Sequence, residues 1–168
     1  NREEFEKKWS DIKLVIEYGM LSEEKFFEKS EKFTLYPTVD DKFFTYEELF
    51  NKIKAKQTDK DDKLIILYAS DKQAQHSYIE NAKNKGYEVL LLDSPIVSHL
   101  IQKLESSKEK IEFSRVDSDH IDNLIDKNEN KVSKLDDNQK KDLEELVKSI
   151  IADDKYVIKL ESMDSSEN

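Results

Sequence analysis

Two adjacent polar residues that follow an apolar run have side chains that could do chemistry. Asp93 and Ser94 lie where open α/β sheets often place ligand-binding groups, and Asp93 there could accept a phosphoryl group. In a simpler interpretation Ser94 caps the next helix and Asp93 is a turn residue, because capping alone explains the placement. We favour this interpretation, since a phosphoacceptor site also needs an acidic pair after the preceding strand, and residues 69–71 contain one acid.

Histidines and neighbouring acids supply weaker candidates. Asp117, Asp119 and His120 are of types that bind divalent metals, but they crowd into four residues and nothing nearby completes a coordination shell. We interpret them as a solvated loop, and His76 and His99 as helix-surface residues. The chain has no cysteine, which excludes thiolate chemistry, and its two glycines cannot form a glycine-rich phosphate loop. The residues therefore predict no catalytic, cofactor-binding or metal site.

Composition excludes several classes of partner. The 168 residues carry a net charge of −10 at pH 7, which argues against binding to nucleic acid or to anionic membranes. No apolar run approaches the roughly 18 residues of a membrane span, and no signal peptide is visible. Charged residues make up 39% and hydrophobic residues 36% of the chain. These proportions predict small packed units with a large charged surface.

Residues 1–57 have the periodicity of a small helical unit. The first helix is expected to stop at Gly19, and Ser22 to cap a second helix that ends before Pro37. A loop or short hairpin follows over residues 39–44. Residues 45–48 read TYEE, a capping box for a third helix. The side chains expected to face inward in the three helices are Phe5, Trp9, Ile12 and Ile16, then Phe26 and Phe33, then Tyr46, Leu49, Phe50 and Ile53.

Residues 58–121 have the pattern of a small α/β unit. Apolar runs over residues 64–68, 89–92 and 111–116 predict three buried strands. One helix is expected from Asp71 to Gly86, with Ala74, Tyr78 and Ala82 inward, and another after Ser94 and Pro95. This order of strands and helices predicts a three-layer α/β/α unit with a short parallel sheet.

The remaining residues are expected to begin another domain. Residues 122–134 are polar and lack periodicity, so we interpret them as a linker. Residues 135–168 then contain a helix capped by Asp136 and Gln139, and a strand over residues 156–160. The expected inner face of this helix consists of Leu143, Leu146, Val147 and Ile150.

Several segments resemble the ninety-kilodalton heat-shock chaperone family, in its bacterial, HtpG-type branch. The most specific is residues 85–96, KGYEVLLLDSPI, which are similar to a strand and turn of that family. Residues 5–14 (FEKKWSDIKL), 45–49 (TYEEL) and 67–70 (LYAS) resemble other family segments, and residues 143–160 resemble the start of its C-terminal domain. Their order and spacing agree over nearly the whole chain. Val97 stands where the family has an acid, so the contacts of that acid are not carried over.

The resemblance implies a piece of an ATP-dependent chaperone, the back of the middle domain and the start of the C-terminal domain. It implies a cytoplasmic stress-response protein that assists folding and binds unfolded or partly folded client proteins. ATP and Mg would bind an N-terminal domain upstream, and the homodimer helices would lie beyond Asn168. The chain itself is then expected to be no enzyme, with a structural and client-contact role. Its first residue, Asn1 rather than Met, fits a piece of a longer protein.

The helix after Pro95 is the expected client-contact surface. Val97 and Ile101 lie four residues apart beside the inner stripe, His99 lies on another side, and the first two turns carry no charge. Exposed apolar groups in a polar rim suit a chaperone surface. Alternatively, Val97 and Ile101 widen the core face, since globular helices often bury a wide stripe. The alternative for the chain as a whole is a stand-alone receiver-like signalling domain with Asp93 as phosphoacceptor.

Overall fold

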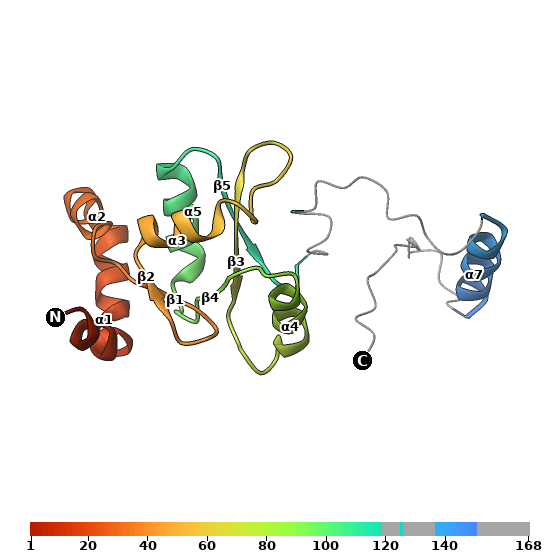
Figure 1. The fold of residues 1–168 in the computed structure, drawn as a ribbon, viewed down its shortest axis with the longest axis horizontal. Helices are drawn as coiled ribbons and strands as arrows, with labels where there is room; N and C mark the ends of the chain where they lie inside the picture. Colours follow the sequence, from red (N-terminus) through yellow and green to blue (C-terminus); the bar gives the residue numbers. More distant parts are fainter. Residues whose placement is uncertain (119–124, 126–136, 151–168) are drawn as a thin grey trace. The chain divides into compact units, whose positions relative to one another are not determined.

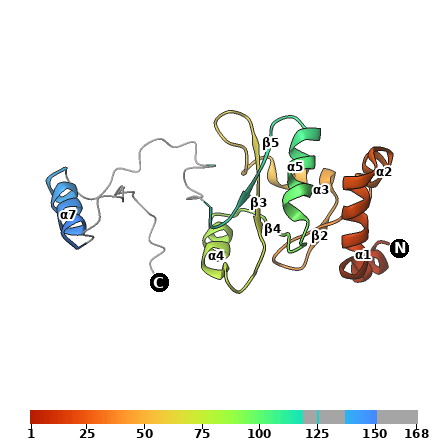
Figure 2. The same ribbon diagram turned by 180° about the vertical axis from the view of Figure 1, so that it is seen from behind.

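The computed structural model describes residues 1–118, 125 and 137–150. The chain divides into two compact units, residues 1–127 and residues 128–168. In the first unit, a small sheet has helix α4 on one side and helices α3 and α5 on the other, with α1 and α2 beyond them (Figures 1 and 2). No described helix is both long and apolar enough to cross a bilayer.

Helix α1 (Arg2–Ser22) continues through Gly19, so the expected stop at this residue is wrong. A Cβ at Gly19 would lie 2.8 Å from a ring carbon of Phe26, so the glycine instead lets the ring pack against the helix backbone. Helix α2 (Glu24–Ser30) is capped by Glu23, not by Ser22 as expected. Its buried aromatic residue is Phe27, while Phe26 is half-buried and Phe33 is exposed.

The hairpin and the third helix follow the expected pattern. Strands β1 (Tyr36–Pro37) and β2 (Phe43–Phe44) pair antiparallel. Helix α3 (Tyr46–Ile53) begins with a complete capping box: the Thr45 hydroxyl accepts from the Glu48 amide at 3.4 Å, and the Glu48 carboxylate accepts from the Thr45 amide at 2.7 Å. Of its predicted inward residues, Leu49 and Ile53 are buried, whereas Phe50 is exposed.

The three predicted strands form one parallel sheet. Strands β3 (Leu64–Ala69), β4 (Val89–Leu91) and β5 (Ile111–Arg115) lie in the order β4-β3-β5. The helices α4 (His76–Asn84) and α5 (Val97–Ser107) connect them. The predicted α/β class and the short parallel sheet are therefore confirmed.

Both connecting helices begin later than expected, α4 at His76 and α5 at Val97, and the N-cap of α5 is Ile96, not Ser94 as expected. The Asp71 carboxylate accepts hydrogen bonds from the amides of Gln73 and Ala74, at 2.8 and 3.0 Å. These bonds form a turn at residues 71–74, and α4 begins after it, at His76. The buried residues of α4 are accordingly Ile79 and Ala82, while Tyr78 is exposed. The helix ends before Gly86, whose φ of 76° is the left-handed conformation expected of a C-terminal glycine.

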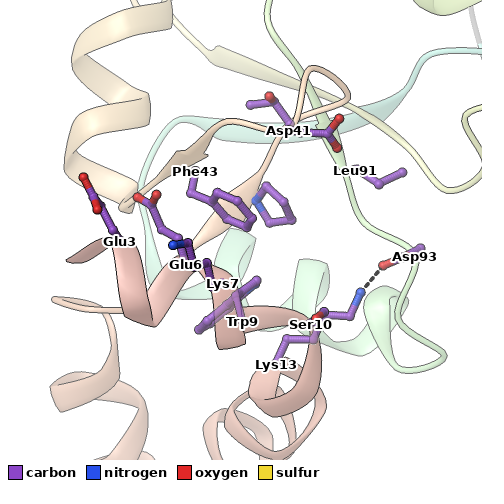
Figure 3. Close-up of a pocket in the computed structure, with 12 residues that line it drawn as sticks. Glu3, Glu6, Lys7, Trp9, Ser10, Lys13, Asp41, Phe43, Leu91 and Asp93 are labelled. Carbon is purple, nitrogen blue, oxygen red and sulfur yellow. Dashed lines mark hydrogen bonds and ion pairs between the residues drawn. The ribbon is translucent and has the colours of Figure 1, made fainter. Parts of the chain in front are cut away.

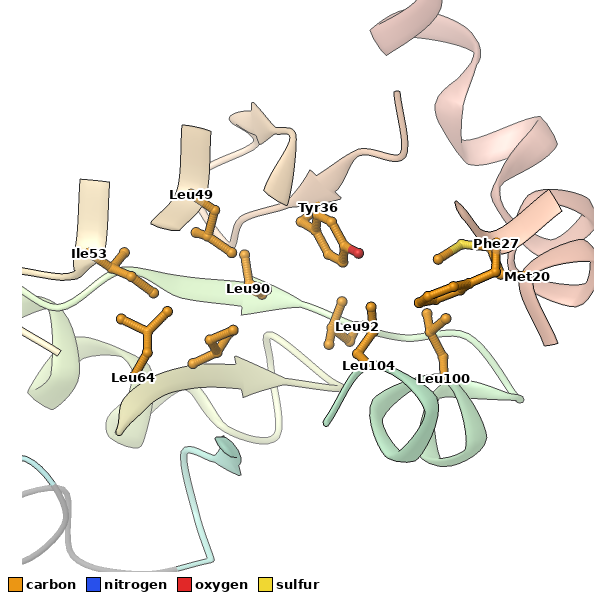
Figure 4. Close-up of a cluster of buried hydrophobic side chains, with 11 residues drawn as sticks. Met20, Phe27, Tyr36, Leu49, Ile53, Leu64, Leu90, Leu92, Leu100 and Leu104 are labelled. Carbon is orange, nitrogen blue, oxygen red and sulfur yellow. The ribbon is translucent and has the colours of Figure 1, made fainter. Parts of the chain in front are cut away.

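Successive residues of β3 point to opposite faces of the sheet and build two cores. Ile65, Leu67 and Ala69 pack with Ile79 and Ala82 of α4. The other core, drawn in Figure 4, contains Leu64 and Ile66 and combines sheet residues with residues from the first 57 positions. Its remaining buried members are Met20, Phe27, Tyr36, Leu49, Ile53, Leu90, Leu92, Leu100 and Leu104.

In the second unit the structure describes helix α7 (Asp137–Ile150), which confirms the expected helix. Of its predicted inner face, Leu143 and Leu146 are exposed and Val147 is half-buried. The predicted cap Asp136, the linker and the strand over residues 156–160 lie outside the described residues. The boundaries predicted at residues 57, 121 and 134 stay predictions.

Candidate functional site

The expected client-contact residues lie on α5. Leu100 and Leu104 are buried in the core, and Val97 and Ile101 are half-buried and pack against the same core. His99 is exposed. Val97 and Ile101 therefore widen the buried face of the helix while keeping part of their surface exposed. Whether clients touch these three residues stays a prediction.

The turn between β4 and α5 holds the sequence Asp93-Ser94. Asp93 is exposed and forms an ion pair with Lys13 of α1. Ser94 is buried, and its hydroxyl accepts from the Ile96 amide at 3.4 Å. The serine thus stabilises the turn that leads into α5, and the aspartate connects this turn to α1.

A buried carboxyl group, which the sequence reasoning missed, lies beside this turn. Glu17 of α1 is 7% exposed, and its Oε2 atom has no hydrogen-bond partner among the described residues. Burial raises the pKa of Glu17; the Ser94 hydroxyl and the charge of Lys13 oppose this, and the charge of Asp93 adds to it. The missed signal was the spacing of Trp9, Lys13 and Glu17, which places two charged residues on the stripe of the buried tryptophan.

The hydroxyl of Tyr36 is a second buried group without a hydrogen-bond partner among the described residues. Burial raises the pKa of Tyr36 well above its usual range, and the nearby Glu31, Tyr46 and Glu17 add to the shift. Tyr36 and Glu17 line the same small cavity, together with Trp9. Two residues that each have a buried polar atom without a hydrogen-bond partner in the described part of the chain therefore line one small cavity between α1 and the sheet.

A larger, open cavity of about 530 Å³ lies next to it (Figure 3). We call it the α1–hairpin cavity. Helix α1, the β1–β2 hairpin and the end of β4 surround it. Asp93, the candidate phosphoacceptor, is among its lining residues, whereas the expected client-contact residues Val97, His99 and Ile101 are not. Its apolar lining is Trp9, Pro37, Phe43 and Leu91, and its other lining residues are Glu3, Glu6, Lys7, Ser10, Lys13, Thr38, Asp41 and Asp93.

The structure does not bring the other candidate polar residues of the sequence analysis together into one site. Asp117 accepts from the Nε atom of Arg115 at 2.5 Å, and Asp119 and His120 lie outside the described residues. His76 is exposed at the start of α4. Within the described part of the chain, no group of three or more His, Asp or Glu side chains could hold a metal ion.

Comparison with known proteins identifies chaperones over most of the chain. No protein-family profile matches it. It is 47% identical over 149 residues to chaperone protein HtpG of Bacteroides fragilis (strain YCH46), which covers 89% of this chain and 22% of the relative. HtpG of Bacteroides thetaiotaomicron is 51% identical over 136 residues, and HtpG of Porphyromonas gingivalis (strain ATCC 33277) is 44% identical over 146 residues. These matches cover 81% and 87% of this chain and 20% and 21% of the relatives.

The fold agrees with this homology. The middle domain of a heat-shock protein of Plasmodium falciparum superposes with a TM-score of 0.51 at 20% identity, over 67% of this chain and 47% of that one. The receiver-like alternative receives no support from these comparisons. The chain spans about a fifth of the length of the curated relatives it matches. Over that span, sequence and fold together show that the chain belongs to the HtpG family of heat-shock chaperones.

Proposed function

We propose that this chain is a structural and client-contact part of an ATP-dependent chaperone that binds unfolded or partly folded proteins. The observation that carries the proposal is the 44–51% identity to HtpG chaperones over most of the chain. Helix α5 is the proposed contact surface, through Val97, Ile101 and His99. Val97 and Ile101 support it, because they are apolar and keep part of their surface exposed.

The nucleotide chemistry is proposed to belong to another part of the parent protein. ATP and Mg would bind there, so the parent would be the ATPase and this chain would not be an enzyme. One sequence feature supports this assignment: the two glycines, Gly19 and Gly86, are too far apart to form a glycine-rich phosphate loop. We further propose that the parent is a cytoplasmic homodimer, joined through a region beyond Asn168.

The client-contact proposal is tested in a full-length chaperone that contains this segment. Replacing Val97 and Ile101 together by Ser should reduce the suppression of client aggregation, because the exposed apolar area of α5 is lost. Tyr78→Ser, which removes an exposed aromatic residue from α4, is the matched control and should have no effect.

Val97 and Ile101 also pack against the core, so their replacement could reduce activity through loss of folding. A second variant therefore changes α5 only at positions outside the core. His99→Glu with Gln102→Glu adds charge at two exposed positions of α5 and leaves the core unchanged. It should also weaken suppression of aggregation. Full suppression by a folded His99→Glu/Gln102→Glu protein would show that α5 does not contact clients.

The nucleotide assignment is tested by titrating the 168-residue chain with ATP and Mg in a calorimeter. No heat of binding is expected at micromolar ATP. Micromolar affinity would contradict the proposal.

A further inference from the structure

The two halves of helix α1 differ in the distribution of charge. The exposed charged residues of the first half are Arg2, Glu3, Glu4, Lys7, Lys8 and Asp11. From Leu14 to Ser22 the only charged residue is Glu17, and its side chain is buried. The second half of α1 therefore exposes no charged side chain, although 39% of the residues of the whole chain are charged.

The second half of α1 has apolar residues on two opposite faces. On one face, Ile16 and Met20 pack in the core. On the other, Leu14, Val15 and Tyr18 are 45%, 73% and 66% exposed. Each residue advances an α-helix by about 100°, so these three side chains lie within about 100° of one another, on the side opposite Ile16 and Met20. We call Leu14, Val15 and Tyr18 the outer face of α1.

A helix segment that is apolar all round is normally buried all round, because an apolar face is stabilised by a partner that removes it from water. Residues 14–22 are too short a stretch to span a bilayer, which takes about 20 apolar residues. The partner that suits this face is therefore another protein surface. The absence of exposed charge favours a permanent contact over a transient one, since permanent interfaces are the more hydrophobic class.

The length of related proteins indicates where a permanent partner comes from. The chain spans about a fifth of the length of its HtpG relatives. The middle domain from Plasmodium falciparum superposes over 47% of its own length, so about half of that domain lies outside the shared fold. A middle domain of this fold therefore contains further folded chain that could cover α1.

We propose that the rest of the middle domain of the parent chaperone covers the outer face of α1, with apolar side chains that pack on Leu14, Val15 and Tyr18. Helix α1 also forms the Lys13–Asp93 ion pair with the turn before α5, and its Met20 shares a core with Leu100 of α5. The covered helix would thus connect the rest of the middle domain to α5. This proposal goes beyond the proposed function and does not depend on α5 contacting clients.

Cysteine labelling tests the proposal, because the 168-residue chain has no natural cysteine. Val15→Cys and the control Glu28→Cys, at an exposed position of α2, are made both in this chain and in the full-length parent. Alkylation by N-ethylmaleimide is followed by mass spectrometry of the peptide that contains each substitution. Both variants should react rapidly in the 168-residue chain. In the parent, Val15→Cys should react at least about tenfold more slowly than in the chain, and Glu28→Cys at an unchanged rate.

A charge substitution tests the contact from the other direction. In a parent that carries Tyr18→Cys, the addition of Val15→Glu should raise the labelling rate at least about fivefold, because a buried unpaired charge weakens an apolar contact. Ser10→Glu, which adds the same charge at an exposed position in the first half of α1, should not change the rate. The melting temperature of the 168-residue chain should be the same with and without Val15→Glu, since Val15 is exposed there.

Several results would overturn the proposal. Unchanged labelling of Val15→Cys in the parent, or equal slowing of Glu28→Cys, would show that the parent does not specifically cover this face. Slow labelling in the 168-residue chain would place the cover within the chain itself. Slowing that requires an added client, or that disappears on dilution, would assign the face to clients or to a second copy of the parent.

Discussion

Glu17 shows how a single residue connects separate parts of the fold. It lies on α1, beside the Ser94 turn that precedes α5 and in the same small cavity as Tyr36 of β1. Transfer of a carboxylate away from water disfavours its charged form, so burial raises the pKa of Glu17, against the opposing influences of Ser94 and Lys13. Folding therefore favours the neutral form of Glu17 more than the unfolded chain does.

The charge state of Glu17 predicts how stability depends on pH. Its pKa is higher in the folded chain than in the unfolded chain, so the stabilisation by the neutral acid is complete below the unfolded pKa of about 4.3 and is lost as pH rises through the folded value. Glu17→Gln removes this dependence. We expect the variant to gain stability over the natural protein as pH rises from about 4 to neutral.

Urea unfolding followed by Trp9 fluorescence at both pH values measures this difference. Glu28→Gln, at an exposed position of α2, is the matched control for the loss of one carboxyl group. A constant difference between the natural protein and Glu17→Gln across this range would contradict the assigned pKa shift.

The two glycines show how far residue type alone can be interpreted. Both were expected to end helices, and Gly86 does so in a left-handed conformation. Gly19 instead lies inside α1, where the Phe26 ring occupies the space of a side chain. In both cases the sequence signal is the same, a glycine at the expected end of a helix. The contact with the next helix decides between them, and that contact is not visible in the sequence.

At the scale of elements, caps explain where helices begin. The capping box of α3 was predictable because Thr45 and Glu48 act on backbone groups within three residues of each other. Ser22 has an equally suitable side chain, but it is the last residue of α1, and Glu23 is the cap of α2. The two residues therefore offer a matched test of capping.

Thr45→Ala should lower the free energy of unfolding by about 1 kcal/mol, since the Glu48 amide loses its acceptor. Ser22→Ala should change it by less than about 0.5 kcal/mol, as is usual for surface substitutions. Chemical denaturation of both variants at neutral pH compares them directly. Equal losses in the two variants would show that the capping box does not stabilise α3.

At the scale of the whole molecule, one core joins the helical segment to the sheet. Met20, Phe27 and Leu49 from the first 57 residues pack in the same cluster as Ile66 and Leu90 of the sheet (Figure 4). Most stability of helices this short comes from burying such a face, not from helix propensity. The helical segment therefore depends on the sheet for the burial of its apolar side chains.

This dependence predicts that residues 1–57 do not fold by themselves. Circular dichroism of this peptide should show little helix and no cooperative melting, because its apolar face would be exposed to water. Residues 1–127, which correspond to the first compact unit, are the control and should melt in one cooperative transition. Cooperative melting of residues 1–57 would instead establish them as an independent subdomain.

The sequence by itself determined the kinds of elements, their order and the family. Strand runs, helical periodicity, the capping box and the segment at residues 85–96 are patterns within short stretches of chain, and these local interactions persist in the fold. Tertiary structure decided which stripe of each helix is buried, because that depends on what the helix packs against. It placed Glu17 in the interior and Tyr78 at the surface. It also formed the α1–hairpin cavity, whose lining residues are distant in sequence and become neighbours when the core assembles.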